Sequence, residues 1–108
     1  MKVALIGSVS SSWHALRGLV RGGVDVVGVL GLDESHAARV SDFQSMRDLA
    51  AEHGIPFRVF HKIGEPGVIR FLSEHPPDLL FVIGLSQLAP PEVLALAPAG
   101  AVGFHPPP

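Results

Sequence analysis

The chain has 108 residues, of which 47% are hydrophobic, 17% charged and 6% aromatic, with a formal net charge of -2. This composition describes one ordinary globular domain, and 8 basic against 10 acidic residues, spread without clusters, argue against a nucleic-acid surface in this segment. The absence of cysteine excludes disulfides and thiolate chemistry, and the opening apolar run is too short for a signal peptide or a membrane span, which predicts a cytoplasmic protein without membrane contact.

Five short runs rich in Val, Ile, Leu and Phe predict β-strands, at residues 2–6, 24–30, 57–60, 79–83 and 101–104. The first, second and fourth runs are almost continuously apolar rather than alternating. Continuous apolar runs are typical of strands that are covered on both faces in a parallel sheet.

Helical patterns separate these strands. The first helix is predicted to bury a stripe of apolar residues around Leu16, with Ser11 or Ser12 as its N-cap. The second is predicted to begin after a cap at Ser41 or Ser45 and to stop at a glycine and a proline.

The remaining connections contain prolines and polar residues. Pro66 is predicted to start a third helix, and a short fourth helix is predicted to follow Pro90 and to run through Leu96. The segment 31–44 is polar enough to predict a long mobile loop.

The alternation of strands and helices predicts a doubly wound, Rossmann-like α/β domain over residues 1–108, with a parallel sheet in the order 3-2-1-4-5. The chain stops in a proline run directly after the fifth strand, so we expect a domain that is truncated there. Exposed sheet edges at the third and fifth strands predict self-association.

Ligands of such folds bind beyond the carboxyl ends of the strands, where the strand order reverses. The residues expected there are Gly7 and Ser8, the segment 84–87, and His105. The turn after the first strand lacks the glycines of a dinucleotide fingerprint and the lysine of a P-loop. Its serines are suited either to anion binding at a helix N-terminus or to plain helix capping.

His105 is the one titratable side chain placed at a strand end beside this reversal, where an imidazole can transfer protons near neutral pH. The other five histidines are interpreted as helix-end, exposed or loop residues. No histidine pair has the spacing of a metal-binding motif, so no metal site is predicted.

A resemblance to a known family is carried by the C-terminal third, which reads PDLLFVIGLSQLAPPEVLALAPAGAVGFHPPP. This segment resembles the folate-dependent formyltransferases, which include methionyl-tRNA and glycinamide ribonucleotide formyltransferases. The resemblance extends over the whole chain through MKVALIGSVSSSWHALRGLV, LDESHAARVSD and DLAAEHGIPFRVF. It implies a transferase that moves a formyl group from 10-formyltetrahydrofolate to an amine.

The resemblance also implies roles for particular residues. His105 matches the family's catalytic histidine. The reduced folate is expected to contact the stretch after the fourth strand, which comprises Gly84, Leu85, Ser86, Gln87 and Leu88. The acceptor is expected to face the serine turn, which comprises Ser8, Ser10, Ser11 and Ser12.

Two features depart from the family pattern. Gly103 stands where well-known members have an asparagine whose amide stabilises the oxyanion, so a backbone N–H or another group must supply that donor, or transfer is poor. The family's later catalytic aspartate would lie beyond Pro108, so we expect the 108-residue segment to be inactive alone.

Three functions follow as alternatives. The first is formyl transfer to a small amine, with a phosphorylated sugar or sugar nucleotide suiting the serine turn and methionyl-tRNA as the other acceptor. The second is a non-catalytic folate-binding or regulatory module on the same fold. The third is a generic nucleotide-binding domain that ignores reduced folates.

Overall fold

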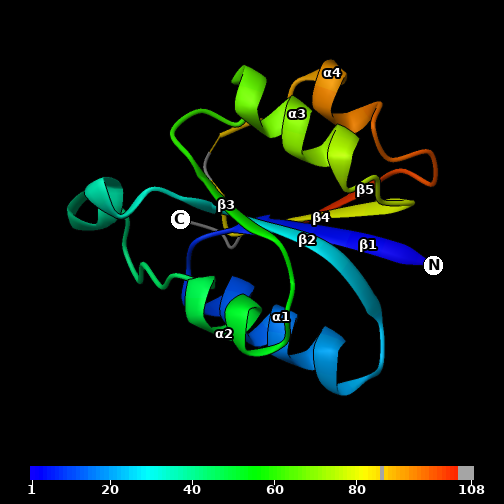
Figure 1. The fold of residues 1–108 in the computed structure, drawn as a ribbon. Helices are drawn as coiled ribbons and strands as arrows, with labels where there is room; N and C mark the ends of the chain where they lie inside the picture. Colours follow the sequence, from blue (N-terminus) through cyan, green and yellow to red (C-terminus); the bar gives the residue numbers. More distant parts are fainter. Residues whose placement is uncertain (86, 105–108) are drawn as a thin grey trace.

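The computed structural model describes residues 1–85 and 87–104, which form one parallel sheet with helices on both faces (Figure 1). The strands are β1 (Lys2–Gly7), β2 (Asp25–Leu32), β3 (Phe57–Phe60), β4 (Leu79–Ile83) and β5 (Ala101–Phe104). Their order is β3-β2-β1-β4-β5, and every neighbouring pair is parallel. The predicted strand order is therefore confirmed.

The segments that connect the strands lie on both faces of the sheet. They contain α1 (Ser10–Arg21), the 3-10 helix η1 (Glu34–Arg39), α2 (Arg47–Glu52), α3 (Pro66–Glu74) and α4 (Pro91–Leu94). In Figure 1, α1 and α2 lie on one side of the sheet, and α3 and α4 lie on the other. This arrangement is the doubly wound α/β fold that the alternation of elements predicts.

The core is divided by the sheet into two apolar layers. In β1, Leu5 packs into the α1 and α2 layer and Ile6 into the α3 and α4 layer, and both side chains are fully buried. In β4, Leu80 packs with Ile6 while Phe81 packs on the opposite layer. Burial on both faces explains why these strands are continuously apolar in sequence.

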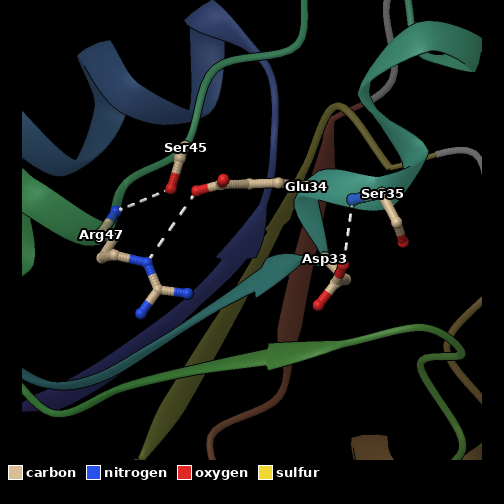
Figure 2. A network of polar contacts seen from close by, with 5 residues as sticks. All are labelled: Asp33, Glu34, Ser35, Ser45 and Arg47. Atoms are coloured by element: carbon tan, nitrogen blue, oxygen red, sulfur yellow. Dashed lines mark hydrogen bonds and ion pairs between the residues drawn. The ribbon is translucent and has the colours of Figure 1, made fainter.

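The helix starts correct two predictions. The N-cap of α1 is Val9, and both Ser11 and Ser12 lie inside the first turn. The second helix begins at Arg47, where the Ser45 hydroxyl accepts a hydrogen bond from the Arg47 amide at 3.1 Å (Figure 2). Ser45 therefore satisfies a backbone donor at this end, although the formal cap is the next residue, Met46.

Two predicted boundaries are also wrong. The fourth helix ends at Leu94 rather than continuing to Leu96. The polar segment 31–44 is not one long loop, because β2 continues to Leu32 and η1 follows it directly.

Polar contacts at the start of η1 hold this short helix in place. The Asp33 carboxylate accepts from the Ser35 amide at 2.9 Å, and Glu34 forms an ion pair with Arg47 at 4.0 Å (Figure 2). Within the described part of the chain, no helix is long and apolar enough to cross a membrane.

Candidate functional site

The reversal of strand order lies between β1 and β4, and two glycines make their carboxyl ends meet closely. A Cβ added at Gly7 would lie 2.5 Å from the Ile83 carbonyl oxygen and would also collide with the Ser12 hydroxyl. Gly84 has a positive φ of 68°, and a Cβ there would collide with the Val9 side chain. The ends of β1 and β4 and the start of α1 are therefore packed closely at this edge of the sheet, and only glycine fits at these two positions.

Two of the four predicted acceptor-binding serines are buried and form hydrogen bonds within these closely packed segments. The Ser8 side chain is 2% exposed, donates to the Gly7 carbonyl at 2.7 Å and accepts from the Leu32 amide. Ser12 is fully buried, donates to the Ile83 carbonyl at 2.7 Å and accepts from the Val9 amide at 3.4 Å. These hydroxyls join the β1–α1 turn to β2 and β4.

The other two serines lie nearer the surface. The Ser10 hydroxyl donates to the Asp42 carboxylate at 2.5 Å, which ties the start of α1 to the segment after η1. Ser11 is partly exposed, and its hydroxyl would lie 3.4 Å from a Cβ on Gly84. Ser11 and the buried Ser12 thus both place a hydroxyl near Gly84, and of the two only Ser11 is partly exposed.

The segment after β4 separates into a buried and an exposed part. Leu85 is 8% exposed and packs in the α3 and α4 layer, whereas Leu88 is 93% exposed. Ser86, which was predicted to contact the folate, lies outside the described residues. Of the predicted folate contacts, Leu88 therefore offers an apolar side chain to a ligand, and Leu85 belongs to the core.

An open groove of about 780 Å³ runs beside this segment. Its walls are residues 61–66, from the connection between β3 and α3, together with Gln87, Leu88 and Pro90. Its volume lies within the range of about 300–1,000 Å³ that is usual for small-molecule sites. The groove contains cationic and anionic groups, since Lys62 and Glu65 both line it.

Polar contacts organise the β3–α3 wall of the groove. The Glu65 carboxylate accepts from the amides of His61 and Lys62, both at 2.7 Å. These hydrogen bonds, with a favourable charge interaction from His61 and Arg58, hold the pKa of Glu65 below its ordinary value.

One pair of side chains at this edge was missed by sequence reasoning. His36 Nε2 lies 2.9 Å from His61 Nδ1, although the two residues are 25 positions apart. The pKa of Asp33 is lowered mainly by its hydrogen bonds with Ser35, and the two histidines add to this effect. The signal that predicts this pair is topological: both histidines follow the carboxyl ends of neighbouring strands, β2 and β3.

Of the two predicted catalytic residues, Gly103 lies within the described residues, in β5. Gly103 pairs with Val82 of β4, and a Cβ added there would meet, among the described residues, only the Val82 carbonyl oxygen at 3.9 Å. As far as the described residues go, packing therefore leaves room for a larger residue at position 103. His105 lies outside the described residues. Within residues 1–85 and 87–104, no three metal-binding side chains gather.

The curated proteins that resemble this chain share one name. No family model matches the chain. Methionyl-tRNA formyltransferase of Symbiobacterium thermophilum is 27% identical over 107 residues, which cover 97% of this chain and 33% of that protein. The enzyme of the same name from Chloroflexus aggregans is 29% identical over 108 residues, which cover 98% of this chain and 35% of the relative. That from Akkermansia muciniphila is 27% identical over 107 residues, covering 97% and 34%.

The chain thus spans about a third of the length of the curated relatives that it matches. The likeness runs over nearly the whole chain, and it agrees with the family that the C-terminal motif resembles. The chain is therefore similar over nearly all of its length to about a third of several methionyl-tRNA formyltransferases.

Proposed function

We propose that this chain is the donor-binding part of an enzyme that transfers a formyl group from 10-formyltetrahydrofolate to an amine. The observation that carries the proposal is the likeness to methionyl-tRNA formyltransferases over 97% of the chain. The strand order supports it, because it brings the carboxyl ends of β1, β4 and β5 to one edge of the sheet. Residues 84–88 and His105 follow two of these strands directly.

The residues of this edge fit a reduced folate. The backbone polar groups of the segment after β4 contact the pterin in this proposal, and the exposed Leu88 supplies an apolar contact. The adjoining groove has the volume of a small-molecule site. The acceptor amine attacks the formyl carbon, and the bond from that carbon to N10 of the donor breaks as tetrahydrofolate leaves. His105 takes up the proton that the amine loses and returns it to the departing N10. N–H groups near the end of β5 stabilise the negative charge that develops on the formyl oxygen.

The proposed acceptor is a small amine, with Ser10 and Ser11 as the hydroxyls that face it. The charge balance favours this class, because 8 basic and 10 acidic residues give no basic surface for a nucleic acid in this segment. The names of the relatives make methionyl-tRNA the competing acceptor. The assay therefore tests three acceptor classes separately: phosphorylated amines, sugar-nucleotide amines and methionyl-tRNA.

The test is formyl transfer by the full-length protein, with His105→Ala compared against wild type and against the exposed-residue control His53→Ala. Loss of the general acid–base group is expected to lower kcat/KM by about 10²- to 10⁴-fold, and the control is expected to leave it unchanged. A loss of less than about tenfold for His105→Ala, or 1.4 kcal/mol, removes His105 from the mechanism.

A non-catalytic folate-binding module is the second candidate, because Gly103 offers no side-chain amide to the oxyanion. Tight binding of tetrahydrofolate without transfer to any of the three acceptor classes favours this candidate. Gly103→Asn distinguishes the two further, since a Cβ at this position meets no described atom closer than 3.9 Å. If Gly103→Asn creates transfer where wild type shows none, the wild-type protein lacks only the oxyanion donor.

A further inference from the structure

The Gln87 side chain bridges two separate connections of the sheet. Its Oε1 accepts from the Ile63 amide at 2.8 Å, and its Nε2 donates to the His61 carbonyl at 2.9 Å. Both ends of the carboxamide are engaged by the same opposing segment, so the orientation of the group is fixed. Gln87 therefore ties the segment after β4 to the segment after β3, which lies 24 to 26 residues earlier in the chain.

The opposing segment is itself held in place. Glu65, which precedes the first residue of α3, accepts from the amides of His61 and Lys62 through one carboxylate oxygen. The Ile63 side chain is 3% exposed and packs in the core beneath the groove. Gln87 is thus bound to an anchored turn, and this turn can restrain the segment after β4.

The restraint acts at the point where that segment turns outward. Leu85, two residues before Gln87, is buried, and Leu88, the residue after it, is almost fully exposed. Between these two residues, Gln87 makes two long-range hydrogen bonds. Without these bonds, the backbone that carries Leu88 would lose its link to residues 61–63, which line the opposite side of the groove.

We propose that Gln87 is a positioning residue that holds the donor-binding segment in its folate-ready conformation by hydrogen bonding to His61 and Ile63. This inference rests on the proposed function, and it gives the carboxamide a role different from a direct contact with the donor. Preorganisation of this kind lowers the conformational cost of binding, so it acts on the affinity for the folate rather than on the chemical step.

The test uses the full-length protein with Gln87→Met, which keeps the length of the side chain and removes both hydrogen bonds. Ser73→Ala is the matched control, because it removes one side chain to backbone bond of 2.7 Å on α3, outside the groove walls. We expect the Ile63 amide to exchange its hydrogen about tenfold faster in Gln87→Met. We expect the Kd for tetrahydrofolate and the KM for the formyl donor to rise about tenfold, while kcat stays within about twofold. Ser73→Ala should change none of these values.

Each contrary result has its own meaning. If Ile63 exchange is unchanged in Gln87→Met, the tether does not exist in solution. If exchange accelerates and tetrahydrofolate affinity is unchanged, the tether does not position the donor segment. If kcat falls while the Kd is retained, Gln87 acts on the reacting groups and the positioning role is wrong. If wild type does not bind tetrahydrofolate at all, the proposed function itself fails, and the exchange of Ile63 still decides whether the tether is present.

Discussion

Removal of the Ser12 hydroxyl is predicted to destabilise the domain, because this group joins α1 to the end of β4. The side chain is fully buried and donates to the carbonyl of Ile83, 71 residues away, at 2.7 Å. In Ser12→Ala, the partly buried Ile83 carbonyl loses this donor and the Val9 amide loses a weaker acceptor at 3.4 Å. No water can easily replace the hydroxyl, because Gly7 and Gly84 bring the backbone close on both sides.

The magnitude follows from two opposing effects. Leaving a buried carbonyl without its hydrogen bond costs about 1–3 kcal/mol. Alanine is the better helix former by roughly 0.5 kcal/mol, which offsets part of that cost. The net expectation is a loss of about 1–2 kcal/mol in the free energy of unfolding.

Urea unfolding of the full-length protein measures this loss, with Ser11→Ala as the matched control. Ser11 lies in the same helical turn and is partly exposed, so its replacement should change the free energy of unfolding by no more than about 0.5 kcal/mol. Equal effects of the two substitutions would refute the reasoning, because they would show that the Ser12 bond to β4 contributes nothing to stability.

Three further predictions use matched pairs or a pH dependence. Gly84→Ala should lower the free energy of unfolding by about 1–3 kcal/mol more than Gly54→Ala, as measured by urea unfolding. Both glycines have a positive φ, but only at Gly84 would the added Cβ collide with a side chain. Equal losses for the two substitutions would contradict the close approach at Gly84. Leu85→Ala should cost about 2–4 kcal/mol, while Leu88→Ala should stay within about 0.5 kcal/mol, and a reversed ranking would show that Leu88 is the buried residue. Since the pKa of Glu65 is lowered in the folded state, its charge stabilises the fold above its unfolded pKa of about 4.3 and this contribution is lost as the pH falls through the folded value. The advantage of wild type over Glu65→Gln should therefore be present at neutral pH and disappear in acid, and a difference that is constant with pH would contradict this assignment.

The strands were predictable because each apolar run is short and bounded by residues that stop it. Predicted and observed bounds agree for β3, β4 and β5, which lie between glycine- or proline-containing connections. The second strand continues to Leu32, beyond its predicted end, because residues 29–32 pair with β3. A strand end that is set by its neighbour cannot be found from local composition.

The cap of α1 illustrates a competition that local rules do not include. A serine before an apolar stripe indicates an N-cap. In the fold, the Ser12 hydroxyl instead donates to a strand 71 residues away, and the helix begins two residues earlier, at Ser10. The sequence indicated that hydroxyls gather at this turn, but their partners depend on the packing of β4 beside β1.

The candidate site was predictable in its place and not in its details. The strand order predicts that the segment after β4 and the serine turn share one edge, and of this segment the described residues Gly84, Leu85, Gln87 and Leu88 follow β4 at the edge where β1 also ends. The division between the buried Leu85 and the exposed Leu88 depends on how the chain leaves β4. The Gln87 tether depends on a connection more than 20 residues away, so it required the three-dimensional structure.

The most direct test of the proposed donor site is a structure of the full-length protein with a bound reduced folate. We expect the pterin to lie against residues 84–88, with Leu88 in contact with the ligand and Gln87 still bonded to the segment after β3. A folate bound at another edge of the sheet, or a pterin that displaces Gln87 from that segment, would contradict the central claim that this edge is the donor site.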